Sequence, residues 1–84
     1  MSTQKIGLIQ TAVSENLDRN LEHTLAMAKQ AIAEGARILC LQELYRTPYF
    51  PQYENRDASA YAETIPGTST EAFSALAREH GVVI

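Results

Sequence analysis

A short apolar run, an amphipathic helix and a second apolar run constrain the fold more than any other feature of this sequence. The first run, Lys5 to Gln10, lacks the strict polar alternation of a strand with one wet face, so we expect a strand buried on both faces. Apolar residues then recur at spacings of 4, 4, 3 and 4, at Leu17, Leu21, Leu25, Ala28 and Ile32. This spacing predicts a helix with one apolar face.

The predicted helix has a start and an end that can be read from the sequence. Asn16 or Asp18 can cap its first amide groups, and Gly35 ends it because glycine accepts the left-handed conformation. A second strand-like run, Arg37 to Leu41, follows directly. Strand, helix and strand in this order predict a right-handed βαβ unit with parallel strands.

A second helix is predicted near the end of the chain. Ile65-Pro66-Gly67 breaks the chain, and Thr68-Ser69-Thr70-Glu71 fits a capping box. One apolar face follows, made by Ala72, Phe73, Leu76 and Ala77. Gly81 ends this helix, and residues 82–84 begin a buried strand inside which the chain stops. We therefore expect a piece of a larger sheet protein, which alone associates or stays partly molten.

Size and composition exclude several classes of protein. Eighty-four residues make one domain at most, and a net charge of −3 without a basic run argues against a nucleic-acid partner. The single cysteine allows no intramolecular disulfide and no Cys-rich zinc site, which predicts a reducing compartment and no metal. The polar first residues resemble neither a signal peptide nor a membrane span, so we expect a soluble cytoplasmic protein without a membrane partner.

Glu43 is the first acidic residue beyond the second predicted strand. Open α/β sheets bind their ligands outside the carboxyl ends of parallel strands, which makes Glu43 the candidate catalytic residue. Apolar residues 38–41 behind it and Leu44-Tyr45 in front are expected to desolvate the carboxylate partly and to raise its pKa toward that of a base near neutrality. The alternative is a solvated charge at the rim of the sheet, or a cap.

The connection from Leu44 to Gly67 exceeds the few residues usual between two elements. Four of the six aromatic residues lie within nine positions of it, at Tyr45, Tyr49, Phe50 and Tyr53. We expect an aromatic rim, in which Tyr49 and Phe50 either wall a substrate pocket or pack the loop onto the sheet or a partner subunit. Three acidic residues could attract a cationic polyamine or form a solvated face: Glu54, Asp57 and Glu63.

Three stretches carry a family resemblance: Lys5-Ile6-Gly7-Leu8-Ile9-Gln10, Asn20-Leu21, and Glu34-Gly35-Ala36-Arg37-Ile38-Leu39-Cys40-Leu41-Gln42-Glu43-Leu44. Together they resemble the amino-terminal part of the nitrilase superfamily of carbon–nitrogen hydrolases. Residues 66–84 resemble the next helix and strand of that family, in the right order. The resemblance implies an α/β fold of the four-layer α-β-β-α sandwich type, with residues 1–84 as the N-terminal portion of a single hydrolase domain.

The resemblance also implies a catalytic Glu, Lys and Cys, of which the Glu falls on Glu43. Lys5, Lys29 and Cys40 do not lie in matching motifs, so the Lys and the nucleophilic Cys would lie beyond residue 84. Cys40 is expected to be a buried, inert residue on the face opposite to Glu43. The implied activity is the cofactor-free hydrolysis of a small amide or N-carbamoyl amine, and the 84-residue chain alone is expected to be inactive.

Residues 43–53 look most like the N-carbamoylputrescine amidase branch, in which a Pro-Tyr-Phe segment follows the Glu. Pro51 stands where those relatives frequently have Cys, so other N-carbamoyl branches of the β-ureidopropionase type and ω-amidases stay open. Relatives commonly form homo-oligomers. The rival interpretation is a non-catalytic α/β binding or interaction module. His23 and His80 are assigned to structural roles.

Overall fold

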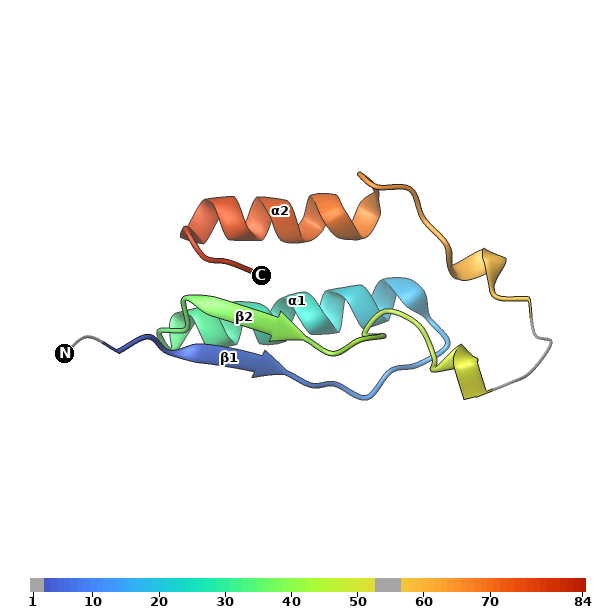
Figure 1. Cartoon of the computed structure of the whole chain (residues 1–84), viewed down its shortest axis with the longest axis horizontal. Coiled ribbons are helices and arrows are strands. Elements are labelled where there is room, and N and C mark those ends of the chain that lie inside the picture. Colours follow the sequence, from blue (N-terminus) through green and yellow to red (C-terminus); the bar gives the residue numbers. More distant parts are fainter. Residues whose placement is uncertain (1–2, 53–56) are drawn as a thin grey trace.

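The computed structural model describes residues 3–52 and 57–84 and confirms the predicted order of elements (Figure 1). The elements are strand β1 (Ile6–Ile9), helix α1 (Leu17–Ala33), strand β2 (Ile38–Leu41) and helix α2 (Thr68–His80). Two short 3-10 turns, η1 (Phe50–Gln52) and η2 (Ser59–Tyr61), lie in the long connection between β2 and α2. β1 and β2 are parallel, with Ile6 opposite Ile38 and Ile9 opposite Leu41, as the βαβ prediction requires.

The last residues of the chain begin a third strand position beside β2. Val83 donates its amide hydrogen to the Arg37 carbonyl at 3.0 Å and accepts from the Leu39 amide at 2.8 Å. These bonds make a parallel bridge between Ile38 and Val83. The strand start predicted at residues 82–84 is therefore confirmed as a bridge, and β2 lies between β1 and Val83.

Side-chain and backbone caps fix the ends of α1. Asn16, and not Asp18, caps its start, because the Asn16 side-chain oxygen accepts from the Arg19 amide at 3.0 Å. The chain leaves the helix through Gly35 at a φ of 101°, a left-handed conformation that glycine tolerates. Lys5 donates to the Glu34 carbonyl at 2.7 Å, which places a cation where the helix presents unpaired carbonyl groups.

α2 ends in the same manner. Gly81 is left-handed, with a φ of 62°. Arg37, which precedes β2, donates to the Gly81 carbonyl at 2.8 Å. Each helix thus ends beside a cation, Lys5 or Arg37, that directly precedes a strand. These contacts join the carboxyl ends of both helices to the amino-terminal edge of the sheet.

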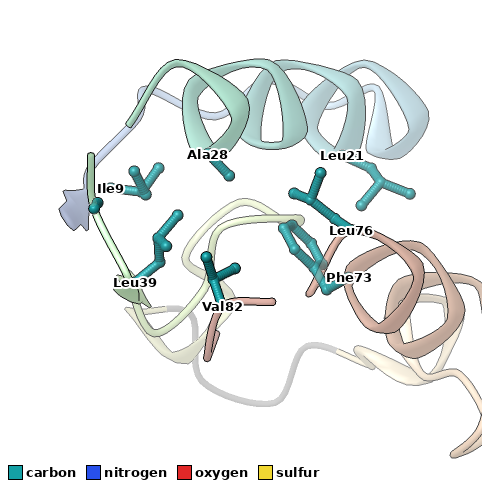
Figure 2. Packing of buried hydrophobic residues seen from close by; sticks show 8 residues of the cluster. Ile9, Leu21, Ala28, Leu39, Phe73, Leu76 and Val82 are labelled. Carbon is teal, nitrogen blue, oxygen red and sulfur yellow. The ribbon is translucent and has the colours of Figure 1, made fainter. Parts of the chain in front are cut away.

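The core lies between one face of the sheet and the two helices (Figure 2). Its buried apolar members come from every main element: Ile9, Leu21, Ala28, Ala36, Leu39, Phe73, Leu76 and Val82. Ile9 and Leu39 project from β1 and β2 toward α1, and Phe73 and Leu76 approach from α2 (Figure 2). Neither helix of the described residues is long and apolar enough to cross a membrane.

The other face of the sheet is bare, so the expectation of strands buried on both faces is wrong for the described chain. The exposed apolar residues on this open sheet face are Ile6 (59% exposed), Leu8 (78%), Ile38 (41%) and Val83 (65%). Cys40 was expected to be buried, but it is exposed as well, in β2 with Ile38. The physical reason is that α1 and α2 both pack against the opposite face, which carries Ile9 and Leu39.

A bare apolar face of this kind predicts self-association of the 84-residue chain. Sedimentation is expected to give a mass above the 9.3 kDa of one chain. Leu8→Lys places a charge at the most exposed of these four apolar positions and is expected to shift the mass toward one chain. Ala26→Lys, at an exposed position of α1, is the matched control and should change nothing. A monomeric wild-type chain with a sharp two-state melt contradicts the prediction.

Candidate functional site

Glu43 lies two residues beyond the end of β2, at the edge of the sheet where both parallel strands have their carboxyl ends. It borders a hollow of about 500 Å³, whose wall is made by residues 43–47 and by Glu63, Ile65, Ser69 and Thr70. The predicted position of Glu43 at the carboxyl edge of the parallel strands is therefore confirmed, whereas its catalytic role stays a prediction. Of the wall residues, Glu63 and Ile65 come from the end of the long connection, and Ser69 and Thr70 come from the start of α2.

The carboxylate of Glu43 is less shielded than the sequence led us to expect. Glu43 is exposed, and no described residue donates a hydrogen bond to its side chain. Tyr45, which was expected to help cover it, packs into the core instead. Its ring meets Phe73 of α2 edge-on, with 5.5 Å between ring centres and 84° between planes. The expected partial desolvation by neighbours is therefore wrong for the described chain, because the aromatic cover is used for packing.

Arg46 is the cation in the wall of the hollow, and carboxylates occupy its guanidinium. Its Nη1 donates to Glu63 Oε2 at 2.6 Å and to Ser69 Oγ at 2.8 Å. Its Nη2 lies 3.4 Å from Asp18 Oδ1, at the start of α1. The Arg46 side chain is only 16% exposed. The guanidinium therefore joins the starts of both helices to the long connection through its two Nη atoms, while its Nε is buried and has no partner among the described residues.

Glu63 caps α2 from outside the helix. Its Oε1 accepts from the Ser69 amide at 2.7 Å, and its Oε2 accepts from the Ser69 hydroxyl at 2.8 Å. The hydrogen bonds from the Ser69 amide and hydroxyl, with the nearby Arg46 guanidinium, lower the pKa of Glu63. The capping box expected within residues 68–71 does not form, because the N-cap position is Gly67, which has no side chain.

Two of the acidic residues considered for polyamine attraction have structural partners. Glu63 holds Ser69 and Arg46, and Asp57 accepts from the Ser59 amide at 2.9 Å at the start of η2. The bonds from the Ser59 amide and hydroxyl lower the pKa of Asp57. Glu54 lies outside the described residues. In its described part, the acidic face that the sequence suggested therefore consists of carboxylates that accept hydrogen bonds from backbone amides of nearby turns and helices.

The aromatic rim is divided between packing and exposure. Tyr49 is 53% exposed, and Phe50 lies against Tyr61 with 5.7 Å between ring centres. Neither contributes to the wall of the hollow beside Glu43, and Tyr53 lies outside the described residues. Substrate binding by Tyr49 and Phe50 stays a prediction.

The remaining titratable residues form no second centre in the described ranges. His23 and His80 are both exposed, and His80 lies in the last turn of α2 as expected. No group of three His, Cys, Asp or Glu side chains there could hold a metal ion. Two exposed carboxylates border the hollow, and because Glu63 is held by Arg46 and Ser69, Glu43 is the one that suits proton transfer to or from a bound group.

Comparison with known proteins shows the family of the chain. Residues 5–84 match the carbon-nitrogen hydrolase family, and the chain therefore belongs to that family. Over all 84 residues the chain is 36% identical to omega-amidase NIT2 of Xenopus tropicalis and of Mus musculus, and 31% identical to that of Homo sapiens. It spans 29% of the length of each of these relatives. These names do not support the N-carbamoylputrescine amidase branch, and they agree with the ω-amidase alternative that the sequence left open.

Arg46 and Ser69 are the site residues that sequence reasoning missed. The sequence feature that could have revealed them is Glu63. It lies six residues before Ser69, on the other side of a Pro-Gly break that can turn the chain back. An extra methyl group on Gly67 would collide with the Thr64 carbonyl oxygen, so this turn requires glycine. The local sequence Thr-Ser-Thr-Glu pointed to a self-contained cap and concealed the more distant one.

The lowered pKa of Glu63 predicts an acid-sensitive contact. The carboxylate stabilises the fold above its ordinary pKa of 4.5, and this stabilisation is lost as pH falls below that value through the lowered pKa. Glu63→Gln should therefore reduce the free energy of unfolding, by about 1 kcal/mol at pH 7, and the difference from wild type should vanish near pH 2. Urea melts at both pH values measure this. Glu71→Gln, exposed in the first turn of α2, is the control with a smaller effect. An unchanged wild-type advantage at low pH would contradict the assignment.

Proposed function

We propose that Glu43 is the general base of an amidase that hydrolyses a non-peptide C–N bond. Residues 1–84 would form the N-terminal portion of its single domain, with the Lys and the nucleophilic Cys of the family supplied by residues beyond 84. One observation carries this proposal. The residue that the family resemblance marks as catalytic stands exposed at the carboxyl edge of parallel strands, beside a hollow of about 500 Å³.

The chemistry follows from the properties of a thiol. A free Cys is mostly protonated at neutral pH, so Glu43 takes its proton and produces the attacking thiolate. The thiolate attacks the carbonyl carbon, and the Lys with a backbone amide stabilises the oxyanion. The C–N bond then breaks, and the departing nitrogen takes the proton held by Glu43. Glu43 next removes a proton from water, which attacks the thioester and releases the acid and the free thiol.

The first proposed substrate class is a small linear molecule with a terminal amide. This choice rests on the omega-amidase names of relatives that are 31–37% identical to the chain. A second class, an N-carbamoyl amine with a cationic end, is favoured by a different observation. In the described wall of the hollow, Glu43 presents a negative charge, while the Arg46 guanidinium is paired with Glu63 and Asp18. A cationic substrate end would therefore meet a favourable field.

The test uses an extended chain that carries the Lys and Cys as well as residues 1–84. Ammonia release is measured with the monoamide of a short linear dicarboxylic acid and with N-carbamoylputrescine. Glu43→Gln is expected to lower kcat by about 100-fold or more, because the variant cannot accept a proton. Glu22→Gln, exposed on α1, is the matched control and should keep the wild-type kcat.

Three results decide the proposal. Turnover of either substrate that depends on Glu43 supports the amidase and identifies its class. Full turnover by Glu43→Gln contradicts the role of Glu43. No ammonia from either substrate, with a folded extended chain, favours the non-catalytic binding module. The 84-residue chain alone is expected to release none.

A further inference from the structure

The segment that carries Glu43 is tied at its first residue by Gln42. The Gln42 side-chain oxygen accepts from the Thr11 amide at 2.5 Å, and its Nε2 donates to the Thr11 carbonyl at 3.0 Å. Thr11 lies two residues beyond β1, where the backbone pairing of the two strands has ended. The side chain of Gln42 thus continues the pairing of β1 and β2 by one more step, directly before Glu43.

The same segment is tied at its other end by Asn20 of α1. Asn20 is 4% exposed, and its Nδ2 donates to the Arg46 carbonyl at 2.7 Å and to the Ser14 carbonyl at 2.8 Å. Its Oδ1 accepts from the Ser14 amide at 2.8 Å and from the Ser14 hydroxyl at 3.0 Å. All the hydrogen-bonding capacity of this buried amide is therefore used on two loops.

We propose that Gln42 and Asn20 are positioning residues that hold the backbone of Glu43 in place for proton transfer. This inference rests on the proposed function. The two amides fix both ends of residues 42–46 to the single loop of residues 11–14. Because no described residue holds the Glu43 carboxylate itself, its place in the hollow depends on the backbone between these two ties.

The position of the two side chains predicts which kinetic constant responds. Neither Gln42 nor Asn20 contributes to the wall of the hollow, so their loss removes no substrate contact. A displacement of the base by about 1 Å costs roughly 100-fold in rate, whereas substrate binding depends on other residues. Loosening either tie should therefore lower kcat and leave KM in place.

The experiment compares two variants with two matched controls in the extended enzyme. Gln42→Met keeps the length of the side chain without its hydrogen bonds, and Asn20→Asp keeps the acceptor for Ser14 but cannot donate to the Arg46 carbonyl. Gln30→Met repeats the first change at an exposed position of α1. Asn16→Ala removes the cap of the same helix, which lowers stability without touching residues 42–46.

We expect kcat to fall about 10- to 100-fold in Gln42→Met and Asn20→Asp, with KM within twofold of wild type. Both controls should keep the wild-type kcat per folded molecule. A second readout is the ¹⁵N relaxation order parameter of the Glu43 amide, which should fall in the two variants and in neither control. Where Asn20→Asp does not fold, Gln42→Met, at a half-buried position, decides alone.

The outcomes separate this inference from the proposed function. If Glu43→Gln is inactive while Gln42→Met keeps the wild-type kcat and the wild-type order at Glu43, the positioning role is overturned and the base assignment stands. An equal fall of kcat in the variants and in Asn16→Ala would show a general loss of stability, which also overturns it. Full turnover by Glu43→Gln removes both proposals.

Discussion

Parallel pairing of β1 and β2 is the constraint on which the rest of the structure depends. Two parallel strands need a crossover, and α1 provides it by returning the chain to the amino-terminal edge of the sheet. Both strands must then end at the same opposite edge. The loops that leave them, residues 10–16 and 42–47, are consequently neighbours, which is why Thr11 meets Gln42 and why Asn20 reaches Arg46.

The long connection is fastened to this edge through charge. Arg46, in the segment after β2, reaches both helices, because its guanidinium contacts Asp18 in the first turn of α1 and Ser69 in the first turn of α2. Glu63 completes the cluster, which then holds one positive and two negative side chains. Negative side chains at helix starts are favourable, so Asp18 and Glu63 each act on a helix end and on Arg46 at once. Three members of this cluster, Arg46, Glu63 and Ser69, also form part of the wall of the hollow beside Glu43.

The sequence predicted the elements well because their signals are local. The spacing from Leu17 to Ile32, the left-handed Gly35 and Gly81, and the start of a third strand at Val83 are all confirmed. Glu43 was located at the edge of the sheet by topology alone. The errors concern solvent exposure and partners. Cys40 and Leu8 were expected to be buried, but they lie on the bare face. Apolar residues on both sides of a strand indicate that both faces can be buried, and they do not show what covers each face.

Distant partners explain the remaining differences between the sequence and the structure. Residues 68–71 had the composition of a capping box, yet Glu63 provides the cap, since a carboxylate brought back by the Pro66-Gly67 turn competes with a local one. Tyr45 was expected to help cover Glu43, but its partly buried ring packs edge-on against Phe73. The sequence around residues 68–71 and around Tyr45 does not determine either contact, because each depends on where α2 packs.

The exposure of Glu43 and the bare face of the sheet have separate causes. α1 and α2 both pack on the side of Ile9 and Leu39, which leaves the open sheet face without a described layer, whereas Glu43 lies beyond the end of β2 and borders the hollow toward the start of α2. What the described residues contribute is the place of this carboxylate: Gln42 ties the segment before it to Thr11, and Asn20 holds the Arg46 carbonyl after it.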